Sequence, residues 1–258
     1  MGILNITSDS FYDGGKYLQP GAYLAQAEKM IQEGADILDI GAYSTRPGAA
    51  EVDEATEKER LTNAIAAIRK QFPEVLISAD TFRASVAKKA IEAGANIIND
   101  ISGGTMDEAM FNTVAELDVP YILMHIQGTP QTMQVDPQYK NVTKEVKNFF
   151  EERIEQLNKK GFKKIILDPG FGFGKTIEHN YQLLREMDQF QSLGLPVLAG
   201  LSRKSMIYKL LNIKAEESLN GTSVLNSFAL QKGAKILRVH DVKEAKEVVQ
   251  LHSLLHKK

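Results

Sequence analysis

Residues that can do chemistry follow short apolar runs at eight places in this sequence. The clearest case is Asp168, which follows the apolar run 165–167 and precedes Pro169 and three nearby glycines. Because proline cannot donate to a sheet, a buried strand is predicted to end at Asp168, with a flexible, close-packing turn after it. The glycine spacing fits neither a phosphate P-loop nor a dinucleotide fingerprint. A carboxylate in this place can accept two parallel hydrogen bonds from a ring with an amidine-like pair of donors.

The other seven runs also end in polar or charged residues. These are Asn5, Ser44-Thr45-Arg46, Asp80, Asn99, His125, Arg203-Lys204-Ser205 and Arg238-Val239-His240. Each is weak evidence alone, because a lone Asp more often caps a helix and a lone Asn more often forms a turn. A functional site is favoured because all eight strand ends are expected to lie at the same end of one sheet.

The chemistry of this set divides into two parts. Asp80, Asn99 and Asp168 offer acceptors for a polar heterocycle. The cationic side chains, or those that can become cationic, suit a phosphate or a carboxylate, and they are Arg46, Lys204, Arg238 and His240. Together these parts predict a transfer between two small molecules.

Two further sites are predicted beside these. The start of a helix at Lys204-Ser205 would hold a second anion on backbone N–H groups. The carbonyl oxygen of Asn5 suits Mg²⁺, which takes oxygen ligands and commonly bridges phosphates. No His or Cys spacing indicates zinc, and no Ser-His-Asp arrangement can be argued.

Eight strand-like runs that alternate with helices must position these residues. The predicted strands are 2–5, 37–40, 75–79, 97–98, 119–124, 164–167, 196–200 and 236–239. The predicted helices are 22–33, 54–70, 84–93, 108–117, 142–160, 178–190, 223–232 and 243–256, and another begins at 202–205. Repeated units of this kind form a parallel sheet, and eight of them in about 250 residues are typical of a closed (β/α)₈ TIM barrel. We therefore expect one α/β domain over 1–258 with its site at the carboxyl ends of the strands; the alternative is an open doubly wound sheet.

Composition limits the class of protein. The chain has 258 residues, a net charge of −2, 43% hydrophobic residues and no cysteine. It has no basic excess for nucleic acid, and no run approaches the roughly 20 apolar residues of a membrane span. The absence of cysteine excludes disulfides, and the first residues are strand-like rather than a signal peptide. We expect a cytoplasmic protein with small-molecule substrates and no nucleic-acid or membrane partner.

The motifs of this sequence resemble those of the dihydropteroate synthases from end to end. The matching segments are Gly2-Ile3-Leu4-Asn5, Asp9-Ser10-Phe11, Asp13-Gly14-Gly15, Ser44-Thr45-Arg46-Pro47-Gly48, Ser78-Ala79-Asp80-Thr81, Ile98-Asn99-Asp100-Ile101, Met124-His125, Asp168-Pro169-Gly170-Phe171-Gly172-Phe173, Ser202-Arg203-Lys204-Ser205 and Arg238-Val239-His240-Asp241. The resemblance implies that (7,8-dihydropterin-6-yl)methyl diphosphate and 4-aminobenzoate condense to 7,8-dihydropteroate and diphosphate, with Mg²⁺. It also implies inhibition by sulfonamides and a homodimer formed through the later helices.

The resemblance implies a role for each matching residue. Pterin-binding groups would be Asp80, Asn99, Asp168 and Lys204. Diphosphate would be bound by Asn5, Thr45, Arg46, Arg238 and His240, with Asn5 also a ligand of Mg²⁺. The 4-aminobenzoate would lie among Thr45, Arg46, Pro47, Phe173, Lys204 and Ser205. The groups that act on the reacting atoms would be Asp80, Lys204, Arg238 and His240.

Four residues at three places depart from the usual pattern of this family, namely Ser8, Ala42-Tyr43 and Ala79, and none of them removes a group with a chemical role. Three other interpretations remain open. One is a barrel methyltransferase that acts on methyltetrahydrofolate with a corrinoid partner, which would not need the diphosphate cluster. Another is a pterin-binding protein without catalysis. The last is a synthase that tolerates sulfonamides, although no insertion is obvious near the second loop or at Phe173.

Overall fold

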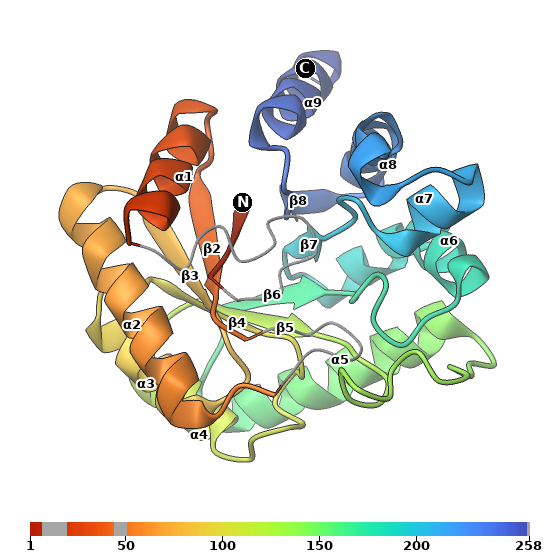
Figure 1. The fold of residues 1–258 in the computed structure, drawn as a ribbon. Coiled ribbons are helices and arrows are strands. Elements are labelled where there is room, and N and C mark those ends of the chain that lie inside the picture. The colour runs from red at the N-terminus through yellow and green to blue at the C-terminus, as the bar shows by residue number, and fades with distance from the viewer. Residues whose placement is uncertain (7–19, 44–50, 257–258) are drawn as a thin grey trace.

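The computed structural model describes residues 1–6, 20–43 and 51–256, and its strands follow one another around a ring (Figure 1). Within these residues eight parallel strands alternate with helices. Their bounds are β1 Gly2–Asn5, β2 Ile37–Gly41, β3 Leu76–Asp80, β4 Ile97–Asp100, β5 Tyr121–Met124, β6 Ile165–Asp168, β7 Val197–Ala199 and β8 Ala234–Leu237. Each strand pairs with the next in chain order.

The ring closes where the chain after β8 meets β1. Gly2 and Val239 form a parallel bridge. The Ile3 N–H donates to the Val239 oxygen at 2.9 Å, and the Val239 N–H donates to the Met1 oxygen at 2.9 Å. The predicted (β/α)₈ barrel is therefore confirmed, and the open doubly wound sheet is excluded.

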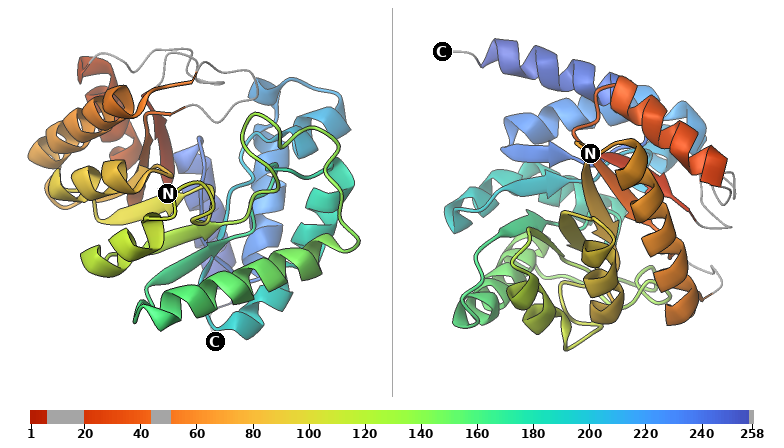
Figure 2. Two further views of the ribbon diagram at one scale, coloured as in Figure 1. Left: turned by 90° about the horizontal axis from the view of Figure 1, so that it is seen from below. Right: turned by 90° about the vertical axis from the view of Figure 1, so that its left-hand side faces the viewer.

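The helices lie outside the ring of strands (Figure 2). Their bounds are α1 Pro20–Gln32, α2 Glu54–Gln71, α3 Ala84–Glu92, α4 Met110–Leu117, α5 Val142–Lys159, α6 Ile177–Arg185, α7 Ser205–Leu211, α8 Leu219–Gln231 and α9 Val242–Leu255, with short 3₁₀ helices η1 Met187–Leu193 and η2 Ala215–Glu217. Within the described residues, every helix is too short or too polar to span a bilayer.

Some predicted boundaries need correction. The predicted helix 178–190 is two elements, because α6 ends at Arg185 and η1 follows it. The last strand lies two residues earlier than predicted, so Arg238 and His240 follow β8 rather than belong to it. Helices α2, α5 and α6 begin directly after a residue whose side chain caps them. Asp53, for example, precedes α2 and accepts a hydrogen bond from the Thr56 N–H at 2.9 Å.

The strands alternate two kinds of side chain, one towards the helices and one into the barrel. The main core lies between strands and helices. A second apolar cluster, built from residues of the opposite parity, fills the inside of the barrel, and it consists of Ile97, Ile122 and Leu198 with the partly buried Met1, Ile37, Ile166 and Ile236. The isoleucines at 37, 97, 166 and 236 come from β2, β4, β6 and β8, as expected when alternate strands supply one layer. This layer closes the barrel interior below the mouth.

Leu198 tests the contribution of this interior cluster. It is fully buried, so Leu198→Ala should lower the free energy of unfolding by about 2–5 kcal/mol, as lost contacts and a cavity add together. Urea denaturation followed by circular dichroism would measure this. The matched control is Leu76→Ala, because Leu76 is 45% exposed, and its effect should stay near 0.5 kcal/mol. Equal losses in the two variants would contradict the packing described.

Candidate active site

A layer of polar side chains lies directly above the isoleucine layer. Two residues after each of the four isoleucines lie Asp39 on β2, Asn99 on β4, Asp168 on β6 and, directly after β8, Arg238. Since side chains alternate along a strand, these residues also point into the barrel. Asp39 is fully buried, and the side chains of Asn99 and Asp168 are almost so. The interior thus changes from apolar to charged within one layer, at the mouth end.

Arg238 joins two carboxylates in this layer. Its Nε donates to Asp39 Oδ2 at 2.6 Å, and its Nη2 donates to Asp80 Oδ2 at 2.7 Å. The Asn99 amide group donates to the two oxygens of Asp39 at 3.3 and 3.1 Å. Three of the predicted residues, from β3, β4 and the end of β8, are therefore in one network. Asp39, which the sequence did not single out, connects them.

Burial and the Asp39 charge raise the pKa of the Asp80 carboxyl to about 7, while Arg238 opposes this rise. The cause is that a carboxylate loses hydration inside the barrel and meets a second carboxylate there. Two acids and one guanidinium leave an excess of negative charge when both acids are ionised. Positive charge that develops on a ligand in this place would be stabilised.

Asn5 and Asp80 flank a small space above Gly41. A Cβ built on Gly41 would lie 3.5 Å from Asn5 Oδ1 and 3.6 Å from Asp80 Oδ2. A side chain at position 41 would therefore fill the space between these two oxygen atoms. Among the described residues, no group of three His, Cys, Asp or Glu side chains is placed to hold a metal. The oxygen atoms at this place fit a Mg²⁺ site in which the protein supplies few ligands and phosphates and water supply the others.

The turn after β6 is held firmly rather than left flexible. Asp168 Oδ1 accepts a hydrogen bond from the Gly170 N–H at 2.8 Å. Gly170 has a φ of +69°, and a Cβ there would lie 1.9 Å from the His125 oxygen, so only glycine fits. The predicted close packing of the turn is correct, and it fixes the direction in which Asp168 faces.

Lys175 also stabilises this turn. Its position in the sequence did not predict this role. Its Nζ donates to the oxygens of Gly170 and Phe173, both at 3.0 Å, and lies 3.0 Å from His125 Nδ1. Burial lowers the pKa of His125 well below its usual value, and the Lys175 charge lowers it further. A neutral His125 can accept from Lys175 through Nδ1. Burial also lowers the pKa of Lys175 to about 7, although Asp168 opposes this shift.

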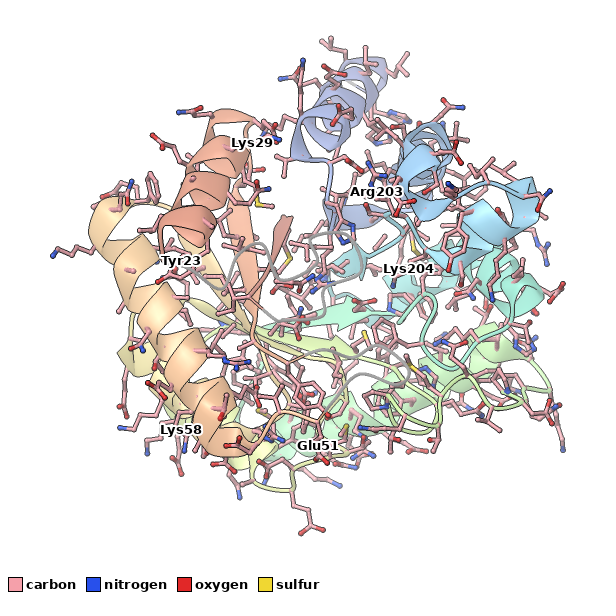
Figure 3. All side chains as sticks on the ribbon, in the orientation of Figure 1. Tyr23, Lys29, Glu51, Lys58, Arg203 and Lys204 are labelled. Carbon is pink, nitrogen blue, oxygen red and sulfur yellow. The ribbon has the colours of Figure 1, made fainter. Side chains whose placement is uncertain are left out.

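Lys204 lies over the outer part of the turn, on the α7 side of the barrel (Figure 3). Its Nζ donates to the Phe171 oxygen and lies 4.8 Å from the centre of the Phe173 ring. Burial lowers the pKa of Lys204 to about 8, against the opposing charge of Asp168. Lys204, Phe173 and Asp168 are thus brought together as predicted, with Ser205 next in the chain as the first residue of α7.

The neighbouring Arg203 has a structural contact instead. Its guanidinium pairs with Asp241 at 2.7 and 2.8 Å and donates to the backbone oxygens of Ala215 and Glu216. These bonds tie the start of α7 to η2 and to the start of α9. Of this motif, Lys204 contacts the turn through the Phe171 oxygen.

The surroundings of His240 favour its neutral form, whereas the sequence suggested a possible cation. Burial lowers its pKa to about 4, and Arg238 adds to the effect. The Ser202 hydroxyl accepts from the His240 backbone N–H at 3.2 Å and lies 3.1 Å from its Nδ1. Since the hydroxyl oxygen already accepts, its own proton is available to Nδ1. In the tautomer with its proton on Nε2, the ring accepts from the Ser202 hydroxyl through Nδ1.

A separate apolar cluster lines the mouth, and sequence reasoning did not find it. It consists of Phe82, Ile101, Met124, Ile126 and Met133, with the partly buried Tyr43, Met106 and Phe173 packed against it. Met124 is the last residue of β5 and Ile101 directly follows β4, so their position at the strand ends was an available signal. The cluster gives a flat ring an apolar surface next to the acceptors. Thr45, Arg46 and Pro47 lie outside the described residues.

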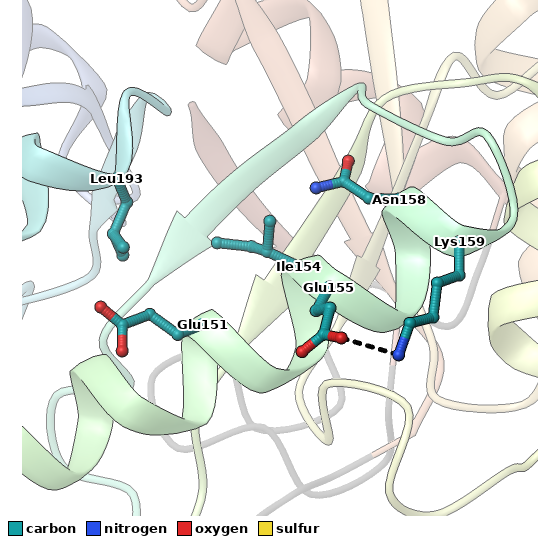
Figure 4. A pocket seen from close by; sticks show the side chains of 6 residues that line it. All are labelled: Glu151, Ile154, Glu155, Asn158, Lys159 and Leu193. Atoms are coloured by element: carbon teal, nitrogen blue, oxygen red, sulfur yellow. Dashed lines mark ion pairs between the residues drawn. The ribbon is translucent and has the colours of Figure 1, made fainter.

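A pocket of about 490 Å³ lies away from the mouth, against α5 (Figure 4). It is lined by Glu151, Ile154, Glu155, Asn158, Lys159 and Leu193. The last turns of α5 precede β6, so they lie at the opposite end of the barrel from the carboxylates. Its one ion pair among the lining residues, Lys159 with Glu155 at 2.7 Å, is exposed and adds little stability.

Comparison with known proteins identifies the family. A family model described as pterin binding enzyme matches residues 1–240. The dihydropteroate synthase of Haemophilus influenzae is 44% identical over 253 residues, which are 97% of this chain and 91% of that protein. The chain belongs to the dihydropteroate synthase family. The resemblance predicted from its motifs is confirmed.

Solved structures agree with this assignment. The Yersinia pestis dihydropteroate synthase, solved with a sulfonamide drug complex, matches with a TM-score of 0.95 and 40% identity over 99% of this chain and 92% of that one. The Xanthomonas albilineans enzyme in complex with 7,8-dihydropteroate matches with a TM-score of 0.89 and 36% identity over 100% and 93%. None of the three relatives is named a methyltransferase.

The partly buried His240 predicts a loss of stability in acid. Its folded pKa of about 4 lies below the unfolded value of 6.5, so the unfolded chain binds more protons between these values. Stability should be fully present above pH 6.5 and fall towards pH 4, by roughly 3 kcal/mol from this group. His240→Gln should reduce that fall, as measured by urea denaturation at pH 7 and pH 4. The exposed His256→Gln is the control, and an unchanged pH dependence in His240→Gln would contradict the assignment.

Proposed function

We propose that the mouth of this barrel condenses (7,8-dihydropterin-6-yl)methyl diphosphate with 4-aminobenzoate to give 7,8-dihydropteroate and diphosphate, with Mg²⁺. The observation that carries the proposal is the single network in which Arg238 joins the acceptors of β2, β3 and β4. It puts a heterocycle site and an anion site next to each other. The family membership supports the same reaction.

The pterin ring would bind between the acceptors and the apolar cluster at the mouth. Asp168 and Asp80 accept from its donors, and Asn99, whose amide group faces Asp39, offers its carbonyl oxygen. Lys204 is the donor on the other side of the ring. A ring that satisfies these buried groups offsets the cost of their lost hydration.

The diphosphate would bind at Arg238, His240 and Asn5, with Thr45 and Arg46 assigned by the family motif. Arg238 brings a permanent charge, and His240 a neutral N–H donor. Asn5 and the diphosphate would hold Mg²⁺, which when bound neutralises phosphate charge. The 4-aminobenzoate would bind beside Phe173, Lys204 and Ser205, with Thr45, Arg46 and Pro47 also assigned by motif.

The reaction we propose begins with departure of the leaving group. The bond between the methylene carbon and the diphosphate oxygen breaks, and the electron pair leaves with diphosphate, where Arg238 and His240 stabilise it. The methylene cation is delocalised into the pterin, and the buried carboxylates of Asp80 and Asp168 favour it electrostatically. The amine of 4-aminobenzoate then forms the new C–N bond and loses a proton. Sulfonamides would compete with 4-aminobenzoate for the site beside Phe173; the similar Yersinia pestis enzyme was solved with a sulfonamide drug complex.

A coupled assay for diphosphate release tests the reaction. With the dihydropterin diphosphate and Mg²⁺, release should depend on added 4-aminobenzoate, and without it only slow formation of the hydroxymethyl dihydropterin is expected. Asp168→Asn should weaken dihydropterin binding by about 1.5–3 kcal/mol, because the ring donors lose a charged acceptor. Folded protein that shows no turnover dependent on 4-aminobenzoate would overturn the proposal. Unchanged dihydropterin affinity in Asp168→Asn would remove that residue from the pterin site.

A homodimer through the later helices belongs to the same proposal. Among the described residues, seven of the nine exposed large apolar side chains lie on α7, α8 and α9. They are Leu210, Leu211, Val224, Phe228, Leu251, Leu254 and Leu255. Helices α8 and α9 lie side by side (Figures 1 and 2). An apolar surface of this kind on a soluble protein marks a contact with another chain. A cytoplasmic location is also proposed, supported by the cysteine-free sequence.

Light scattering at micromolar concentration tests the dimer. Wild-type protein should have twice the mass of the chain, and Leu251→Asp should shift it to the monomer, because a charge would be buried in the interface. Leu251 is 64% exposed, so the variant should fold normally. Leu76→Asp on another face is the control. A monomeric wild-type protein would refute the proposal.

A further inference from the structure

We propose that Asp39 is a positioning residue that holds Arg238 and Asn99 in place and so couples the diphosphate end of the site to its pterin end. The inference rests on the proposed function for the identity of the two ends. Asp39 lies in the middle of β2, two residues before the strand ends at Gly41. It belongs to no strand-end motif, and its side chain has no exposed surface, so it acts through other residues and does not touch substrate.

Both partners contact the same carboxylate, and they share its Oδ2 atom. Oδ2 accepts from Arg238 Nε at 2.6 Å and from Asn99 Nδ2 at 3.1 Å, and Oδ1 lies 3.3 Å from the same Nδ2. Charge-assisted bonds of this length are among the stronger ones in proteins. Neither partner can move without leaving a buried carboxylate with fewer donors, which is costly.

The contact with Arg238 fixes the direction of its guanidinium. Arginine presents its N–H groups in a rigid planar fork, so a bond at Nε sets the plane of the whole group. With Nε turned inward to Asp39, the terminal nitrogens lie on the side of Asp80, and Nη2 is bonded to it. A diphosphate at the mouth meets donors whose orientation has already been set.

The contact with Asn99 fixes the direction of its amide. A carboxamide can expose either its oxygen or its NH₂ group, and only the acceptor suits a ring donor. Asp39 is an acceptor on both oxygens, so it selects the orientation in which the NH₂ faces inward. The Asn99 oxygen is thereby left for a ligand. The Asp39 carboxylate therefore orients both the Arg238 donors that face the diphosphate and the Asn99 oxygen that faces the pterin.

Asp80 and Asp39 differ in their access to ligands. The Asp80 side chain is 16% exposed and that of Asp39 is 0% exposed, although both contact the same guanidinium. A ligand that takes Asp80 competes with Arg238, whereas no ligand reaches Asp39. Asp39 is consequently the partner that Arg238 keeps throughout the reaction.

Binding measurements on Asp39→Asn test the coupling. By calorimetry, the affinity for 6-hydroxymethyl-7,8-dihydropterin and the affinity for diphosphate with Mg²⁺ should both fall at least tenfold. The KM for 4-aminobenzoate should change less than twofold. Glu57→Gln is the matched control, because Glu57 is a fully buried carboxylate paired with Arg83, and it should leave both affinities unchanged. Lower stability with both affinities intact, or loss of only one, would overturn the proposal.

A double mutant separates the two routes. Lysine has no Nε–H fork, so in an Arg238→Lys background Asp39→Asn should no longer alter diphosphate affinity, while its effect on the dihydropterin should persist. Additive losses of diphosphate affinity would contradict action through Arg238.

Wild-type protein provides a readout that needs no folded Asp39 variant. The Arg238 Nε–H should give a ¹⁵N NMR signal, absent in Arg238→Lys, that is protected from solvent exchange with or without diphosphate and Mg²⁺. Loss of this protection on binding would show that Arg238 leaves Asp39, which overturns the proposal. A wild-type protein that binds both probes but turns nothing over would refute the proposed reaction and leave the coupling intact.

Discussion

The sharing of one guanidinium between two carboxylates, Asp39 and Asp80, is the interaction on which the rest of this site depends. Charge inside a barrel has lost most of its hydration, so it persists only where partners replace water. Arg238 replaces it for both acids, at 2.6 and 2.7 Å. Because the three residues come from β2, β3 and the end of β8, the site exists only when the ring of strands is closed.

Closure and the polar layer support each other. The isoleucines of the even-numbered strands fill the barrel interior. Two residues further along the chain, Asp39, Asn99, Asp168 and Arg238 form the next layer towards the carboxyl ends of the strands, so the packing of the isoleucines positions these polar side chains. A shift of one residue in a strand would exchange the inward and outward faces. The bridge between Gly2 and Val239 therefore fixes both the barrel and the position of Arg238, which precedes Val239.

Much of this arrangement could be predicted from the sequence, because it follows local rules. Apolar runs followed by polar residues predicted the strands and the barrel, and the strand ends identified Asp80, Asn99, Asp168 and Lys204 as candidates. Asp39 was missed because it lies inside an apolar run, and only the layer pattern of the closed barrel shows where it points. Lys175 was missed because its partners, His125 and the oxygens of the glycine turn, come together only after folding. The neutral state of His240 was also hidden, since it results from burial and from Arg238.

The mutual hydrogen bonds of these buried residues limit the mutations by which the protein could become resistant to an inhibitor. Asn99, Asp39 and Arg238 each use buried groups to satisfy the others, so a change in any one leaves a charge or a donor without its partner. Gly170 allows no side chain at all. An inhibitor that binds only to this interior layer contacts residues that the protein cannot exchange without losing its own substrate. An inhibitor that depends on side chains outside this layer contacts residues that single mutations can change without loss of the hydrogen bonds described.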